Sequence, residues 1–231
     1  MTYLATRNRV EQYFDQTATD VWARLTSDAP VSGIRATVRA GRDHMRQAFL
    51  ASLPNDLSQC RILDAGCGTG ALSVQLALRG AQVVAVDIAP QLLEIAQKRL
   101  PEDLKGHVQF SHADMQQSEL GTFDYVVAMD SLIYYTSQDI ALALHAISKR
   151  VGYSILFSLP PRTLLLQCMW TVGRLFPRAD RSPLMVPQHE RGLRAAFRAH
   201  DFHDWDFQQK ERVRSGFYHA QLYELKRGGL C

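Results

Sequence analysis

A glycine-rich loop holds the residues of this sequence whose types and spacing are best suited to chemistry. Residues 64–70 read DAGCGTG, directly after a short apolar run and directly before a stretch of good helix formers. Glycine lets a backbone turn sharply and approach a ligand closely, and open α/β sheets bind ligands at the carboxyl ends of their strands. We therefore predict that Gly66, Cys67, Gly68 and Gly70 belong to a cofactor-binding loop.

Two carboxylates stand at positions that such a loop uses. Asp64 begins the loop, where its carboxylate can accept a hydrogen bond from an amino group. This favours the ammonium group of S-adenosylmethionine (SAM) over the diphosphate of a dinucleotide. Asp87 ends the next apolar run, 17 positions after Gly70, about where Rossmann folds bind ribose hydroxyls. The alternative for Asp87 is an ordinary N-cap for the helix expected from Ala89. We predict that Asp87 and the following Ile88 contact the cofactor.

The elements that must position these residues alternate between short apolar runs and helix-like stretches. This rhythm predicts βαβ units and a mostly parallel sheet. The expected strands are 61–65, 82–87, 107–111, 123–129 and 153–158, and the expected helices between them are 72–79, 89–100 and 138–149. Two further strands, 204–210 and 217–225, are expected to form an antiparallel C-terminal hairpin. The predicted fold class is α/β, a Rossmann-like, mostly parallel sheet of seven strands with helices on both faces.

The segments that flank this alternation are expected to select the substrate. Residues 1–55 are predicted to form a helical N-terminal arm, and residues 56–231 the cofactor-binding domain. A Pro-Pro pair at 160–161 interrupts the alternation, so a lid insertion is expected at about residues 160–190. An apolar helix is expected inside this lid, over residues 164–175.

Four arginines follow a helical spacing in the N-terminal arm, which places them on one face of a single helix. They are Arg35, Arg39, Arg42 and Arg46. Such a face either attracts an anionic ligand or an acidic partner, or is an ordinary solvated surface. Because the solvated surface is the commoner case, these arginines stay outside the predicted site.

Composition excludes several kinds of protein. The 231 residues include 26 basic and 23 acidic side chains, a balance that argues against nucleic-acid binding. The four cysteines show neither metal-binding spacing nor a disulfide framework, so reduced thiols and no metal site are expected. We find no signal peptide and no apolar run near the roughly 18 residues of a membrane span, so a cytoplasmic protein with no transmembrane segment is expected.

Two further positions complete a pattern that is typical of one family. Asp114 and Met115 follow the third expected strand, and Met129 ends the fourth. Together with the glycine loop and Asp87, this order resembles the class I SAM-dependent methyltransferases. The resemblance implies that SAM is the co-substrate, that Asp114 contacts its adenine amino group, that Met115 packs on the adenine ring, and that Met129 lies beside the methionine part.

The flanking segments resemble one branch of that family, the magnesium-protoporphyrin IX O-methyltransferases of bacteriochlorophyll and chlorophyll biosynthesis. The segments that carry this resemblance are 10–15 with Trp22, 62–72, 129–135, 175–183 and 215–218. The resemblance implies transfer of the SAM methyl group to one propionate carboxylate of magnesium-protoporphyrin IX, which gives the monomethyl ester. It also implies a partner, the porphyrin-binding subunit of magnesium chelatase, and peripheral association with membranes.

Tyr13 and Tyr134 are the predicted catalytic residues, and their expected role is to position the acceptor carboxylate or steer its proton. A propionate with a pKa of about 4.5 is already ionised at neutral pH, so no strong general base is required. Position 134 is often histidine in the related branch, and the tyrosine in this sequence favours positioning over acid–base chemistry. Taken without the resemblance, a tyrosine in a helix such as Tyr13 is more often a core aromatic residue.

Three other functions compete with this one. A nicotinamide oxidoreductase would need the G-x-G-x-x-G spacing, which this loop lacks. A degenerate SAM-binding regulator would not need the intact acids Asp64, Asp87 and Asp114. A SAM-dependent methyltransferase that acts on another small molecule, such as a quinone or an amine, stays open, because the fold alone does not identify the acceptor.

Overall fold

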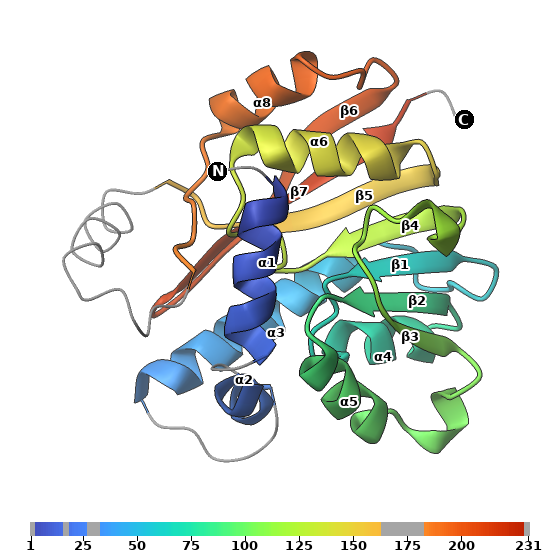
Figure 1. Ribbon diagram of the computed structural model, residues 1–231. Coiled ribbons are helices and arrows are strands. Elements are labelled where there is room, and N and C mark those ends of the chain that lie inside the picture. The colour runs from blue at the N-terminus through green and yellow to red at the C-terminus, as the bar shows by residue number, and fades with distance from the viewer. Residues whose placement is uncertain (1–2, 16–18, 27–32, 163–182, 229–231) are drawn as a thin grey trace.

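The computed structural model describes residues 3–15, 19–26, 33–162 and 183–228 and contains one sheet of seven strands (Figure 1). The strands are β1 (Arg61–Ala65), β2 (Gln82–Asp87), β3 (Val108–His112), β4 (Phe123–Ala128), β5 (Val151–Leu159), β6 (Trp205–Ser215) and β7 (Tyr218–Arg227). Their order in the sheet is β3-β2-β1-β4-β5-β7-β6. The first five pair in parallel, whereas β7 runs antiparallel to β5 and β6. The predicted fold class is therefore confirmed.

The central strands β1 and β2 have the bounds that the sequence predicts. Each is an almost continuous apolar run, and the structure buries nearly all of its residues. This is typical of parallel strands that are covered by helices on both faces. Apart from β6, the other predicted elements are shifted by one or two residues at their ends, as is usual for boundaries read from a sequence.

Helices cover both faces of the sheet (Figure 1). They are α1 (Tyr3–Tyr13), α2 (Thr19–Leu25), α3 (Gly33–Ala51), α4 (Ala71–Leu78), α5 (Pro90–Arg99), α6 (Ser137–Ser148) and α8 (Glu190–Arg198). Buried residues of α3 and α4 pack against one face of the sheet. Those of α6 and α8 pack against the other face. In Figure 1, α1 lies across the edge where the parallel strands end.

The sequence did not predict α8, the helix that follows the expected lid. Leu193, Ala196 and Phe197 are its buried residues. They face an aromatic cluster in which the Phe157 ring lies 5.5 Å from the Tyr223 ring and 6.4 Å from the Phe207 ring, centroid to centroid. The sequence does not indicate this helix because its apolar residues are few and alternate with arginines. Only the packing of these apolar residues against the aromatic cluster shows that α8 covers the sheet.

The C-terminal hairpin is longer than predicted. β6 extends to Ser215, five residues beyond the expected end at Lys210, and its register with β7 shifts between Gln209 and Arg212. This edge strand carries charged side chains over much of its length, which is a common protection of sheet edges and hides the alternating pattern of a strand.

The two flanking segments are described in part. The arm contains α1, α2 and α3, and the domain boundary expected after residue 55 falls between α3 and β1. The expected lid helix at 164–175, with most of the lid, lies outside the described residues. Within the range where the lid is expected, Pro161 forms an isolated bridge with Gln188. Within the described residues, no helix has the length and apolar character needed to cross a membrane.

We expect Phe157→Ala to lower the free energy of unfolding by about 3–5 kcal/mol, because the ring is fully buried and its loss leaves a cavity among the aromatic side chains. Urea denaturation followed by circular dichroism measures this change. The matched control is Phe217→Ala, which removes a ring that is 54% exposed and should change stability by no more than about 0.5 kcal/mol. Equal effects of the two substitutions would contradict the packing described above.

Candidate cofactor and acceptor site

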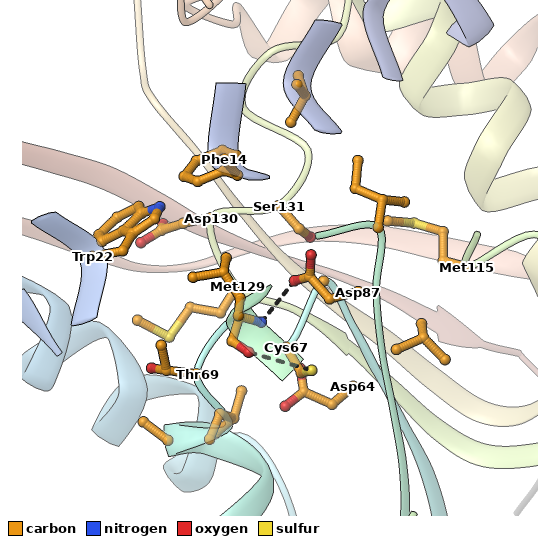
Figure 2. A pocket seen from close by; sticks show the side chains of 18 of the residues that line it. Phe14, Trp22, Asp64, Cys67, Thr69, Asp87, Met115, Met129, Asp130 and Ser131 are labelled. Atoms are coloured by element: carbon orange, nitrogen blue, oxygen red, sulfur yellow. Dashed lines mark hydrogen bonds between the residues drawn. The ribbon is translucent and has the colours of Figure 1, made fainter. Parts of the chain in front are cut away.

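A pocket opens at the carboxyl ends of β1, β2 and β4 (Figure 2). It encloses about 1040 Å³ when its open mouth is included. Of the residues predicted for the site, all except Tyr13 and Gly70 line this pocket. The lining also includes residues from α1, α2 and α3, so the N-terminal arm contributes directly to the site.

The glycine loop is fastened to the end of β2. The N–H groups of Gly66 and Cys67 donate to the Val86 carbonyl at 2.8 and 3.0 Å. The Gly68 N–H donates to a carboxylate oxygen of Asp87 at 2.7 Å. Gly68 has a φ of +55°, and a Cβ there would meet no atom within 4 Å, so this glycine faces open space in the pocket.

The other two glycines of the loop serve packing. A Cβ on Gly66 would collide with the Ser131 side chain, which approaches from the loop after β4. Gly70 precedes α4, and a Cβ there would lie 3.1 Å from Ala96 and 3.2 Å from Phe110. Gly70 does not line the pocket, because it lies behind the loop where α5 and β3 approach it, and its contact with the cofactor stays a prediction.

Asp87 lines the pocket and also accepts hydrogen bonds from two backbone N–H groups. One carboxylate oxygen accepts the Gly68 N–H, and the other accepts the Ala89 N–H at 2.9 Å, at the start of α5. A carboxylate has about four acceptor sites, so the pocket-facing lone pairs remain available to hydroxyl groups of a ligand. Burial raises the pKa of Asp87, and the backbone hydrogen bonds lower it in part.

Asp64 is a buried acid at the end of β1. Its carboxylate accepts a hydrogen bond from Ser73 Oγ at 2.6 Å, and it lines the pocket close to Asp87 (Figure 2). Burial is the main cause that raises the pKa of Asp64 to about 7, and the charge of Asp87 adds to it. A cationic group in the pocket would oppose both effects, so the position suits an ammonium ligand.

Cys67 lies between these two acids and lines the same pocket. Burial raises the pKa of its thiol well above the usual value, and the carboxylates of Asp87 and Asp64 raise it further. The thiolate is the nucleophilic form of cysteine. At neutral pH this side chain is therefore an inert part of the wall.

Asp114 is bound by the N-terminal helix α1. The Tyr3 hydroxyl lies 3.3 Å from each of its carboxylate oxygens, and Arg7 Nε forms an ion pair with it at 3.1 Å. Tyr3 also stacks on Tyr135, with ring centroids 4.8 Å apart. The sequence indicated neither contact, because more than 100 positions separate α1 from Asp114 and no local pattern marks the pairing.

The two predicted catalytic tyrosines occupy different positions. Tyr134 is buried and lines the pocket, 6.1 Å from the Phe14 ring between centroids. Tyr13, at the end of α1, does not line the pocket, and its ring lies edge-on to Phe14 at 5.3 Å. Phe14 is the neighbour whose side chain points into the cavity (Figure 2).

The arginines of α3 are expected outside the site from the sequence, and the structure corrects this for two of them. Arg42 and Arg46 line the pocket. Arg39 donates to the backbone carbonyls of Leu25 and Arg24, at 3.0 and 2.7 Å. The face that the sequence describes as solvated is therefore largely turned toward α2 and the pocket.

The acid Asp64 allows a test of this electrostatic description without any ligand. Between about pH 4 and pH 7 the folded protein retains a proton on Asp64 that the unfolded chain has released. The stability linked to this group is therefore complete below about pH 4 and is lost as the pH rises through about 7. Asp64→Asn should remove this loss, so the difference in stability between the variant and the unmodified protein should move in favour of the variant between about pH 4 and pH 7 and stay constant at higher pH.

Urea denaturation at several pH values measures this difference, with the exposed Asp103→Asn as the control. A difference between Asp64→Asn and the unmodified protein that is constant with pH would show that Asp64 has an ordinary pKa.

Sequence models of two families match the chain. The family described as magnesium-protoporphyrin IX methyltransferase C-terminus matches residues 128–227, and a methyltransferase domain matches residues 62–151. The magnesium-protoporphyrin O-methyltransferase of Rhodobacter capsulatus is 51% identical over 97% of this chain and 98% of its own. The enzyme of that name from Synechocystis is 27% identical over 94% of this chain and 95% of its own.

The fold is similar to that of a solved structure. The crystal structure of magnesium protoporphyrin IX methyltransferase from Synechocystis, with bound S-adenosylhomocysteine (SAH), has a TM-score of 0.81 and 25% identity. The match covers 96% of this chain and all of that one. With identity above one half to the Rhodobacter relative along nearly the full length of both chains, this protein belongs to the magnesium-protoporphyrin O-methyltransferase family.

Proposed function

We propose that this protein transfers the methyl group of SAM to a propionate carboxylate of magnesium-protoporphyrin IX, which gives the monomethyl ester and SAH in (bacterio)chlorophyll biosynthesis. The observation that carries the proposal is the 51% identity to the Rhodobacter relative over 97% of this chain. Because this match includes the flanking segments, it supports the acceptor as well as the methyl donor.

The pocket offers groups that fit SAM. The Asp64 carboxylate would bind the ammonium group, and Asp87 with Ile88 would bind the ribose. Ser131 Oγ is buried in the pocket wall and has no hydrogen-bond partner among the described residues, so it would form a hydrogen bond with a polar atom of the ligand. No atom lies within 4 Å of the position that a Cβ would take at Gly68, so the cofactor could approach the backbone closely there.

The adenine end would lie farther along the same crevice. Met115 lines the pocket there and would pack on the ring, while Asp114 would accept the adenine amino group beside its contacts to α1. Met129 would lie along the methionine part. These assignments place the cofactor across the point where the strand order reverses, which is the usual ligand position in open α/β sheets.

The chain's own residues would promote the reaction mainly by positioning and by excluding water. SAM supplies an electrophilic methyl group: a carboxylate oxygen forms the new C–O bond while the S–C bond breaks and its electron pair stays on sulfur. Opposite charges disappear in this step, so a pocket with little water favours it. Phe14, Trp22, Tyr134 and Tyr135 form an aromatic wall that suits both the exclusion of water and a flat macrocycle.

Tyr134 and Tyr13 are proposed to position the acceptor carboxylate. Tyr134 supports this role by its place in the aromatic wall. Tyr13 would act from the end of α1 beside Phe14, at the rim of the pocket.

Three finer assignments remain proposals. We propose that residues 1–55 form an arm on a cofactor-binding domain of residues 56–231, and that this domain has a substrate lid at about residues 160–190. We propose that the protein works in the cytoplasm with peripheral membrane contact. We also propose that the porphyrin-binding subunit of magnesium chelatase delivers the substrate.

A methyltransferase that acts on a quinone is the second candidate. Ubiquinone biosynthesis O-methyltransferases from Xanthomonas oryzae are 32% identical over 133 residues, but the match covers 53% of this chain and 54% of theirs. Because the match covers only about half of each chain, it supports a cofactor-binding domain common to both proteins more than it supports a common acceptor.

The test of the proposed function is a transfer assay with methyl-labelled SAM and three acceptors: magnesium-protoporphyrin IX, metal-free protoporphyrin and a quinone precursor. We expect label in an alkali-labile ester of the magnesium porphyrin. Asp87→Ala should raise the Kd for SAM by at least about tenfold, because it removes a charged acceptor from the pocket. Asp103→Ala, an exposed acid outside the pocket, should leave it unchanged. Label on the quinone alone would overturn the acceptor but keep the methyl donor.

Tyr134→Phe should lower kcat by about 10- to 100-fold with little change in the Kd for SAM, since a misplaced acceptor slows transfer without affecting cofactor binding. Tyr13→Phe should lower kcat in the same direction. Tyr153→Phe, a half-exposed tyrosine on β5, is the matched control. Unchanged kcat in Tyr13→Phe would assign that ring to packing against Phe14 instead.

A further inference from the structure

Gln188 is a buried glutamine at which separate parts of the chain meet. It is only 4% exposed and lies in the residues that lead into α8. Its side-chain amide donates to the Tyr135 carbonyl and to the Val186 carbonyl, both at 2.9 Å. Its side-chain oxygen accepts the Ser137 hydroxyl at 2.7 Å. Both donors and the acceptor of this side chain therefore have partners inside the protein.

The backbone of Gln188 is bound to the chain that follows β5. Its N–H donates to the Pro160 carbonyl at 2.8 Å, and its carbonyl accepts the Arg162 N–H at 2.9 Å. Pro160 comes directly after the end of β5, so these two bonds fix Gln188 relative to the sheet. The amide has a single orientation, because turning it over would set its oxygen against two carbonyl oxygens.

The loop between β4 and α6 carries part of the pocket wall, including Tyr134. The segment that ends at Gln188 binds two backbone carbonyls of this loop, those of Ile133 and Tyr135. The Val186 N–H donates to the first at 2.8 Å, and the Gln188 amide donates to the second. Because these carbonyls stand on either side of Tyr134, the two bonds fix the backbone from which that ring enters the pocket wall.

Hydrogen bonds to this backbone define the place of Tyr134 more sharply than ring contacts do. The Tyr134 ring lies 6.1 Å from the Phe14 ring, with an angle of 61° between their planes. Contacts between aromatic rings tolerate a range of distances and angles. Hydrogen bonds are short and directional by comparison, so they leave the loop little freedom.

We propose that Gln188 is a positioning residue for methyl transfer and that it acts through Tyr134. This inference rests on the proposed function, in which Tyr134 holds the acceptor carboxylate in line with the methyl group. A displacement of about 1 Å in such a group lowers the rate by about 100-fold. The glycine loop is fastened by other bonds, to Val86 and Asp87, so SAM binding does not depend on Gln188.

The decisive variant is Gln188→Met, which keeps the length of the side chain and removes its three hydrogen bonds. With saturating SAM, kcat for magnesium-protoporphyrin IX should fall by about 10- to 100-fold. The Kd for SAM, measured by isothermal titration, should change by less than about twofold. An unchanged kcat in a folded Gln188→Met variant would overturn the proposal.

Gln221 on β7 provides a matched control for the loss of stability. It is 6% exposed, and its amide nitrogen lies 3.0 to 3.3 Å from three backbone carbonyls of the C-terminal hairpin. It does not line the pocket. Gln221→Met should lower Tm about as much as Gln188→Met but leave kcat unchanged. An equal fall of kcat in the two variants would show that Gln188 acts only through stability, against the proposal.

A double-mutant cycle tests whether Gln188 acts through Tyr134. If it does, Gln188→Met costs little more once the Tyr134 hydroxyl is gone. The double variant Gln188→Met with Tyr134→Phe should therefore keep kcat within about threefold of Tyr134→Phe alone. Two losses that multiply would mean independent action and would contradict the proposed route.

Hydrogen exchange followed by mass spectrometry tests the positioning without any turnover. Gln188→Met should speed amide exchange in the loop between β4 and α6 by at least about tenfold and leave the glycine loop unchanged. Gln221→Met should speed exchange only in the hairpin. This pattern in a protein that methylates no porphyrin would disprove the proposed function and leave the positioning of Tyr134 standing. Unchanged exchange in the loop would overturn the inference even in an active enzyme.

A milder variant keeps the test available if Gln188→Met does not fold. Ser137→Ala removes the hydroxyl that the Gln188 side-chain oxygen accepts and leaves both amide donors in place. It should lower kcat by about 3- to 10-fold with the same unchanged Kd for SAM. A full kcat together with unchanged loop exchange in this variant would count against Gln188 as a positioning residue.

Discussion

The parallel pairing of β1 with β2 on one side and β4 on the other is the constraint on which the site depends. The chain reverses its direction of travel across the sheet at β1, so the loops after β1 and β4 leave the sheet toward the same crevice. The glycine loop fits this crevice because Gly66 lacks a Cβ where Ser131 approaches. The Asp87 carboxylate then fastens the loop through the Gly68 N–H, which is a charge-assisted hydrogen bond in a buried place.

Burial also determines the electrostatics of the pocket. Asp64 has a raised pKa because a carboxylate loses hydration inside the protein, and the single hydroxyl of Ser73 only partly replaces that hydration. The structure therefore presents an acid whose charged form gains stability when a cation binds. Arg42 is the reverse case: its partner Asp130 is already in place, so its charge is compensated before any ligand arrives.

The N-terminal arm is part of the site through contacts that join residues far apart in the chain. α1 reaches Asp114 through Tyr3 and Arg7, while Trp22 on α2 packs beneath the Arg42 guanidinium of α3. These helices add aromatic side chains and two guanidinium groups to a pocket whose other walls carry acids, glycine backbone and apolar side chains.

Much of the fold and the cofactor half of the site follow from the sequence by itself. Short-range patterns carry this information, since apolar runs predict buried parallel strands and the residues after them lie at one edge of the sheet. Asp64, Asp87 and Met129 are assigned to this edge by the sequence pattern alone.

The tertiary structure decided which residues come to the edge from elsewhere. Gly70 is turned away because α5 packs behind it, and Arg42 is turned inward because Asp130, 88 positions later, accepts its hydrogen bond. Helical spacing showed that the arginines of α3 share a face, but only packing against the sheet determined what that face meets.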